Sequence, residues 1–90
     1  MSIEPEDYTE YDWFGEARIR EKAGDSEGAL RAYEEAVNIN PSFEKAWFYK
    51  AQLHHRLGQK DEAIACAKKT LELKPAWEKH VRKFLPDITL

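Results

Sequence analysis

The sequence predicts an all-α fold, a solenoid of two helix-turn-helix hairpins closed by a short capping helix. First, residues 44–79 repeat residues 10–45 at a spacing of 34 positions without a gap, and nine of the 36 residue pairs are identical, where average residue usage gives about two. Second, apolar residues recur with the 3.6-residue period of a helix, and no segment alternates long enough to indicate a strand. Third, glycine and proline stand at the same points of both repeats.

The identical pairs are spread along the repeat rather than clustered at one end. They are Glu10/Glu44, Trp13/Trp47, Phe14/Phe48, Ala17/Ala51, Gly24/Gly58, Ala29/Ala63, Pro41/Pro75, Glu44/Glu78 and Lys45/Lys79. The repetition has a physical reason, because one hairpin cannot bury its own apolar face and a second hairpin stacked on it helps to do so.

Helices over residues 8–22 and 26–39 are expected to form the first hairpin. Gly24 stands where the first helix must end, because glycine tolerates positive φ, and Asp25 can cap the second helix. Pro41 ends that helix by restricting the residue before it. The positions that follow the helical period are Trp13 and Ala17, then Ala29, Tyr33, Ala36 and Val37.

The second hairpin is expected over residues 43–57 and 60–73. Ser42 is a candidate N-cap for its first helix, Gly58 ends that helix, and Pro75 ends the second one. The positions that follow the helical period are Trp47 and Ala51, then Ala63, Ala67, Thr70 and Leu71.

Alanines are predicted to bring the two helices of each hairpin close together. Ala17 faces Ala29 in the first hairpin, and Ala51 faces Ala63 in the second. Because these side chains are small, the backbones can approach, and a larger residue at Ala63 should overpack the contact.

A fifth helix over residues 77–85 is expected to cap the second hairpin. Val81, Phe84 and Leu85 would cover the apolar side of that hairpin, and Pro86 ends the helix. Lys79, Arg82 and Lys83 would point outward, which gives the terminal unit the polar outer face that it needs.

The pattern Trp-x₃-Ala-x₆-Gly-x₄-Ala-x₁₁-Pro with its period of 34 resembles the tetratricopeptide repeat. The matching residues are Trp13, Ala17, Gly24, Ala29, Tyr33, Ala36 and Pro41, then Trp47, Ala51, Gly58, Ala63 and Pro75. The departures from the family pattern are Glu16, Arg20, Lys50, His54, Ala67 and Thr70. The resemblance implies a right-handed α-solenoid in one domain over 1–90, with repeats at 10–43 and 44–77, a cap at 77–85 and a tail at 86–90.

The resemblance also implies a non-catalytic protein–protein interaction module, whose first helices line a groove. Lys45, Gln52 and their aromatic neighbours recur on one face of the third helix, opposite Trp47 and Ala51. The groove residues expected in this chain are Phe14, Arg18, Lys45, Phe48, Tyr49, Gln52, Lys79 and Lys83. The alternative is that Phe14 and Phe48 simply pack between neighbouring helices.

Some members of this family hold the free carboxylate of an acidic chaperone tail with basic and amide side chains. Lys79 and Lys83 match the basic pair that the first helix of the third repeat contributes to this clamp. This match gives the chain a co-chaperone-like feature. Phe14 replaces a lysine of that clamp, and Arg18 and Tyr49 replace asparagines. The expectation is therefore a looser relative of the clamp that binds an extended acidic peptide.

Charge is spread unevenly along the chain, whose net charge is −3. Residues 1–35 hold 11 acidic and 4 basic side chains, which gives −7, and residues 36–90 hold 6 and 10, which gives +4. The positive half is either an ordinary solvated surface or a surface that attracts acidic partners. The split also suggests an alternative function, structural self-assembly in which copies stack head to tail. Nucleic acid is not expected as a partner, because no dense basic stripe is present.

No motif for catalysis or for a cofactor is found, so neither an enzyme nor a cofactor is predicted. The only soft metal-ligand candidates are His54, His55, His80 and Cys66, and their spacing does not form a site. His54 and Cys66 are interpreted as packing residues. No apolar run approaches the ~20 residues that span a bilayer, and the lone cysteine favours a reducing, cytoplasmic setting.

Overall fold

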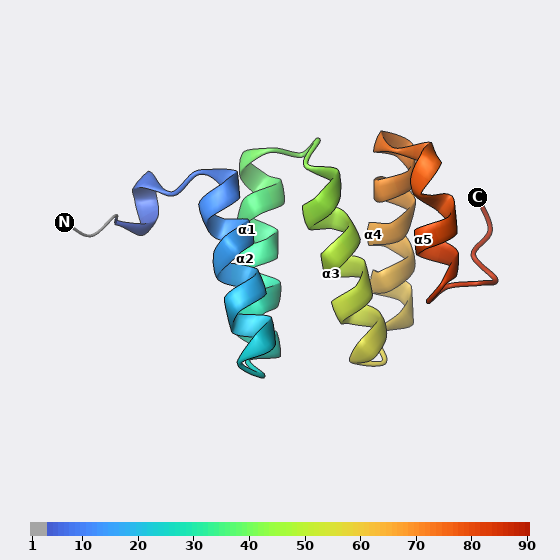
Figure 1. Cartoon of the computed structure of the whole chain (residues 1–90), viewed down its shortest axis with the longest axis horizontal. Coiled ribbons are helices and arrows are strands. Elements are labelled where there is room, and N and C mark those ends of the chain that lie inside the picture. The colour runs from blue at the N-terminus through green and yellow to red at the C-terminus, as the bar shows by residue number, and fades with distance from the viewer. Residues whose placement is uncertain (1–3) are drawn as a thin grey trace. The chain divides into compact units, whose positions relative to one another are not determined.

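The computed structural model describes residues 4–90, and every regular element in that range is a helix (Figure 1). The helices are α1 (Glu10–Lys22), α2 (Ser26–Ile39), α3 (Glu44–Arg56), α4 (Lys60–Leu73) and α5 (Glu78–Arg82), with short 3₁₀ turns η1 (Pro5–Asp7) and η2 (Pro75–Trp77). The fold class predicted from the sequence is all-α, and it is confirmed. The chain divides into a first unit that ends at Phe43 and a second unit, Glu44–Leu90.

The first unit is a hairpin of α1 and α2 (Figure 1). Helix α1 begins at Glu10 rather than at residue 8, because Thr9 caps it. The Thr9 hydroxyl accepts from the backbone N–H of Asp12 at 3.2 Å, and the Asp12 carboxylate accepts from the backbone N–H of Thr9 at 2.9 Å. This capping box satisfies two backbone donors reciprocally.

The turn between α1 and α2 follows the sequence prediction. Gly24 has a φ of 86°, which only glycine adopts without strain, and Asp25 accepts from the backbone N–H of Gly28 at 2.9 Å. Ala17 and Ala29 are both completely buried, as the small-residue pattern requires. Tyr33, also completely buried, provides the largest side chain of this core.

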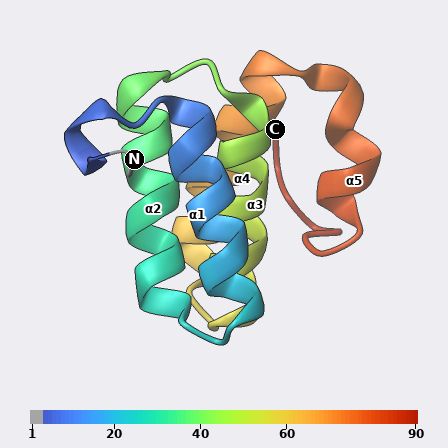
Figure 2. The ribbon, with the colours of Figure 1, turned by 60° about the vertical axis from the view of Figure 1, so that its left-hand side comes forward.

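The second unit is the hairpin of α3 and α4 with α5 packed on it (Figure 2). Gly58 makes the turn with a φ of 76°. The core contains the facing alanines Ala51 and Ala63, together with the buried Cys66, which confirms that this cysteine is a packing residue. The backbone N–H of Ser42, the expected cap of α3, donates to the side-chain oxygen of Asn40 at 3.1 Å.

The capping helix is shorter than the sequence predicts. The sequence predicts it over 77–85, whereas α5 ends at Arg82 and Pro75–Trp77 form a separate 3₁₀ turn. The last helical hydrogen bond runs from Leu85 N–H to Val81 at 2.9 Å, and Pro86 then disfavours helical geometry at Leu85. Val81 and Leu85 are nevertheless buried against α4, and Phe84 packs beside them, so the predicted contacts of the cap are confirmed.

The segment after α5 also joins the core, which the sequence did not reveal. In Figure 2 the chain turns back after α5 and runs along it in the opposite direction. Ile88 is only 7% exposed and belongs to the same core as Val81 and Leu85. The segment expected to be a tail is therefore attached to the second hairpin through Ile88, while its other residues are exposed.

Candidate functional site: an aromatic and basic surface of the second unit

Aromatic side chains gather around Phe48, a half-buried residue of α3. Its ring centroid lies 5.5 Å from that of Tyr49, 5.6 Å from Trp77, 5.8 Å from Phe84 and 6.4 Å from His80, and each pair meets edge to face. These separations and angles are the favourable ones for aromatic pairs. The rings join α3 to η2, α5 and the turn that follows α5, and they are called the aromatic cluster below.

The helical period explains why these rings meet. Trp77, His80 and Phe84 are spaced i, i+3 and i+7, which places them on one side of the capping segment. Phe48 and His55 are likewise seven residues apart on α3, and the His55 ring lies 5.6 Å from that of Phe84. Two stripes of rings therefore meet along the line where α5 lies on α3.

Lys79 and Lys83 lie on the opposite side of α5 from its buried residue. Each is two positions from Val81, which corresponds to about 200° around a helix, so the two lysines share the outer face. Both are exposed, and within residues 4–90 neither of them makes an ion pair. Glu78, the nearest carboxylate along the helix, is bound to Arg82 at 2.8 Å.

The remaining candidates of the second unit follow α3. Lys45, Tyr49 and Gln52 are spaced i, i+4 and i+7 on one face of this helix. Lys45 is exposed, Tyr49 and Gln52 are half-buried, and Tyr49 belongs both to this face and to the aromatic cluster. Six of the eight predicted site residues thus belong to the second unit.

The other two candidates, Phe14 and Arg18, lie on α1 in the first unit. The Phe14 ring packs against Tyr33 at 6.0 Å and against Phe43 at 5.2 Å. The Arg18 guanidinium is 3.3 Å from the Glu21 carboxylate and 3.5 Å from the Tyr33 hydroxyl. Both side chains therefore have structural contacts within their own unit, which fits the packing alternative for Phe14.

The sequence reasoning did not assign Trp77 or His80 to the site, although both contribute to the aromatic cluster. Their spacing with Phe84, at i, i+3 and i+7, indicates a shared face of the capping segment. The sequence interpretation treats His80 only as a metal-ligand candidate and Phe84 only as a capping residue, so it makes no use of this spacing.

The histidines and the cysteine do not assemble into a metal site in the part of the chain that the structure describes. His54, interpreted from the sequence as a packed residue, is half-buried, and its Nδ1 lies 2.7 Å from the Gln59 side-chain oxygen. Between residues 4 and 90, no helix is long and apolar enough to cross a membrane.

The charge asymmetry follows the boundary between the two units. All 11 acidic and 4 basic side chains of residues 1–35 belong to the first unit, and the 6 acidic and 10 basic side chains of residues 36–90 belong to the second. The second unit thus carries a net charge of +4, to which Lys79 and Lys83 contribute, and it also contains the aromatic cluster.

Comparison with known proteins adds one match. A family model described as the tetratricopeptide repeat matches residues 14–76, which covers parts of both units. A search of curated protein sequences finds no match.

Proposed function

Because this chain belongs to the tetratricopeptide repeat family, whose repeats form a non-catalytic fold for protein–protein interaction, we propose that it binds an extended acidic peptide of a partner protein. The binding surface is the basic and aromatic face of the second unit. The observation that carries the proposal is the pair Lys79 and Lys83, which is exposed and makes no ion pair within residues 4–90.

The two lysines provide the charge that such a peptide requires. They lie one helical turn apart, so carboxylates two residues apart on an extended chain, which share a face, can each meet one ammonium group. Hydrogen bonds to charged groups contribute about 1.5–3 kcal/mol, but only where the groups are partly desolvated. Because both lysines are exposed, their contribution is expected at or below the lower end of that range.

Aromatic rings supply the apolar part of the interaction. Tyr49 and Phe48 are half-buried, so each still presents some ring surface to a ligand. An apolar side chain of the peptide is assigned to this ring surface, while Lys45 and Gln52 extend the polar contacts along α3. Phe14 and Arg18 belong to the first unit and stay predictions, since Arg18 would have to exchange its contact with Glu21 for one with the peptide.

The expected affinity is low. A surface of this size should bury less than the ~1,200 Å² of a standard interface, which corresponds to micromolar binding at about −8 kcal/mol. Binding should weaken as salt is added, because exposed charges are screened beyond ~10 Å at 0.1 M ionic strength.

A charge-matched pair of variants tests the proposal. An acidic peptide library is titrated against the wild-type chain, the Lys79→Ala/Lys83→Ala variant and the Lys22→Ala/Lys74→Ala variant. Both variants remove two exposed positive charges, so a general electrostatic effect lowers binding equally in both. Loss of peptide binding in Lys79→Ala/Lys83→Ala but not in Lys22→Ala/Lys74→Ala supports the assignment of Lys79 and Lys83 to the binding surface. Equal affinity of all three proteins for every peptide that binds rules it out.

A second candidate function is self-assembly, which is favoured by the opposite charges of the two units, −7 and +4. Head-to-tail pairing would bring the negative unit of one copy to the positive unit of the next. Sedimentation across a series of protein and salt concentrations tests this candidate. A species that remains monomeric at every concentration and salt level excludes it.

A further inference from the structure

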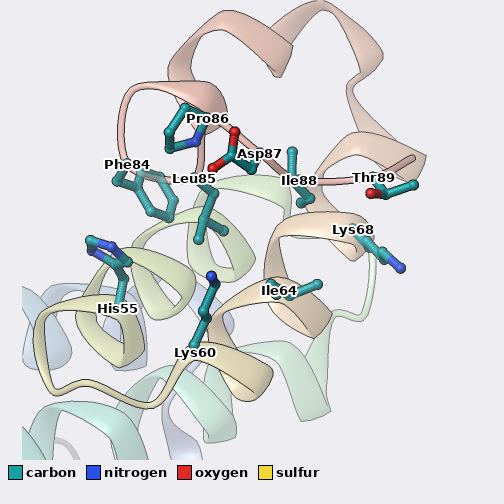
Figure 3. Close-up of a pocket in the computed structure, with 10 residues that line it drawn as sticks. All are labelled: His55, Lys60, Ile64, Lys68, Phe84, Leu85, Pro86, Asp87, Ile88 and Thr89. Atoms are coloured by element: carbon teal, nitrogen blue, oxygen red, sulfur yellow. The ribbon is translucent and has the colours of Figure 1, made fainter.

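A cavity of about 490 Å³ lies between α4 and the chain that follows α5 (Figure 3). This volume falls within the ~300–1,000 Å³ of protein ligand pockets. The cavity is separate from the outer face of α5, since neither Lys79 nor Lys83 lines it. One wall is formed by α4 and another by the segment Pro86–Thr89, which is called the tail wall below. The rest of the lining consists of His55, Phe84 and Leu85, so the cavity borders the aromatic cluster at Phe84.

The α4 wall alternates positive and apolar side chains. Lys60, Ile64 and Lys68 are spaced i, i+4 and i+8, so they form a single stripe along the helix (Figure 3). Both lysines are exposed, Ile64 is half-buried, and within residues 4–90 neither lysine makes an ion pair. The stripe therefore offers an apolar contact with a positive charge on each side of it.

The tail wall is held by few contacts. Arg82 donates from one guanidinium nitrogen to the backbone oxygens of Pro86 at 3.0 Å and Ile88 at 3.1 Å. Ile88 inserts into the core of the second unit, and its own N–H reaches the Leu85 oxygen at a long 3.3 Å. One arginine and one apolar side chain thus keep this segment in place.

The tail wall matches the apolar part of the α4 stripe but not its two positive charges. It places an apolar β-branched residue, Ile88, directly after a carboxylate, Asp87. Asp87 nevertheless makes no ion pair with Lys60 or Lys68, although all three residues line the same cavity. In an extended segment, side chains two residues apart point to the same side. Carboxylates two residues before and two residues after an apolar residue lie about 13 Å apart, which matches Lys60 and Lys68 at about 12 Å along α4.

We propose that this cavity is a second peptide site, which binds an extended partner segment with one carboxylate two residues before a β-branched apolar residue and another two residues after it. The partner's apolar side chain takes the place of Ile88, and its carboxylates meet Lys60 and Lys68. The segment Pro86–Thr89 of the same chain occupies this site and competes with the partner segment. Because it is tethered, it acts at an effective concentration of about a millimolar, so it keeps the site closed to weak ligands.

The probe for this site is derived from the tail itself. It is a peptide of residues 85–90 carrying the changes Pro86→Glu and Leu90→Glu, with fluorescein joined to its N-terminus through an amide bond and with an amidated C-terminus, so that neither terminus carries charge and the label is the same in every peptide. A control peptide carries Ile88→Ser in addition. Binding is measured by fluorescence anisotropy on full-length chains.

Two variants separate release of the tail from general weakening of α5. Arg82→Ala removes the donor that holds the tail, whereas Glu78→Ala breaks only the 2.8 Å ion pair with Arg82 and leaves the bonds to Pro86 and Ile88 possible. The Arg82→Ala chain should bind the probe at least about fivefold more tightly than the wild-type and Glu78→Ala chains, because the competing tail is loosened. Within the Arg82→Ala chain, Lys60→Glu/Lys68→Glu should abolish binding, and Lys74→Glu should preserve it.

The proposal is overturned if Arg82→Ala binds no better than Glu78→Ala, if reversal of Lys60 and Lys68 has no effect, or if the serine peptide binds as tightly as the probe. Should Arg82→Ala fail to fold, the wild-type chain decides the question by NMR. At millimolar probe the amide signals of Ile64 and Ile88 should shift, and they should not shift in the Lys60→Glu/Lys68→Glu chain. Loss of binding in Lys79→Ala/Lys83→Ala would instead assign the probe to the outer face of α5.

Discussion

The hydroxyl of Tyr33 donates a 2.6 Å hydrogen bond to the carboxylate of Glu21, and this bond ties α2 to α1 in the first unit. Tyr33 is completely buried, and Arg18 approaches both partners, at 3.3 Å from Glu21 and 3.5 Å from the Tyr33 oxygen. A buried hydroxyl requires a partner, and here the partner is charged, so the bond is stronger than one between neutral groups.

Tyr33→Phe should therefore lower the free energy of unfolding by roughly 1.5–3 kcal/mol, the range for a hydrogen bond to a charged group. Urea unfolding followed by circular dichroism measures the change. Tyr11→Phe is the control, because Tyr11 is 68% exposed and loss of its hydroxyl should change stability by no more than about 0.5 kcal/mol. Equal effects of the two substitutions would show that the bond to Glu21 does not stabilise the hairpin.

Two glycines should respond to alanine with opposite signs. Gly58 has a φ of 76°, so Gly58→Ala forces a side chain into the left-handed region at a cost of about 1–2 kcal/mol. Gly15 lies within α1, and an added Cβ there meets no atom within 4 Å, so Gly15→Ala should stabilise the chain by about 0.5–1 kcal/mol. Thermal melts of the two variants decide this, and a gain in stability for Gly58→Ala would contradict the turn geometry.

The cap of α2 should make stability depend on pH in the acid range. The backbone N–H of Gly28 is the main reason that the pKa of Asp25 is lowered from its ordinary value of 3.8, and Arg20 contributes a 3.2 Å ion pair. Because the folded chain favours the carboxylate, the stabilisation is complete above the ordinary pKa and is lost as pH falls through the lowered one.

Asp25→Asn keeps a side-chain oxygen for the cap but does not titrate. The wild-type chain should therefore be the more stable of the two near neutral pH, and its advantage should shrink as pH falls below about 4. Urea midpoints measured across this range provide the test. If both chains lost stability in parallel, the Asp25 carboxylate would have no special role in the cap.

The helices could be predicted from the sequence because local signals determine them. Gly24 and Gly58 mark turns at which positive φ is needed, and the predicted span 26–39 agrees with α2. The sequence predicts too long a capping helix because the apolar spacing of Phe84 and Leu85 continues past Arg82, although the backbone does not continue as a helix. Apolar spacing reports which residues are buried, and it does not require them to be helical.

The candidate site was less accessible to sequence reasoning. The resemblance placed Phe48, Lys79 and Lys83 on first helices, and the structure locates all three in the second unit. The packing of the tail through Ile88 and Arg82 could not be predicted, since it depends on where a short irregular segment turns back. No periodic pattern encodes such a turn, because the segment contains no regular element.

Close packing of alanines should make the second hairpin sensitive to side-chain size. Ala63 is completely buried opposite Ala51, so Ala63→Leu should overpack the contact and cost about 1–3 kcal/mol. Ala65→Leu is the matched control on the same helix, because Ala65 is exposed and the added side chain meets solvent. Chemical unfolding of both variants gives the comparison, and tolerance of leucine at Ala63 would disprove close approach of α3 and α4.

Removal of residues 76–90 should unfold or aggregate the second unit. This deletion takes away Val81, Leu85 and Ile88, which cover the apolar surface of α4 around Ala67 and Leu71. A terminal repeat needs a polar outer face, and the deletion replaces that face with exposed apolar side chains.

Removal of residues 89–90 alone is the control, because both residues are exposed and neither belongs to the core. Differential scanning calorimetry should show a cooperative transition for the control and a weakened or absent one for the longer deletion. An equally cooperative transition in both chains would show that the capping segment is dispensable.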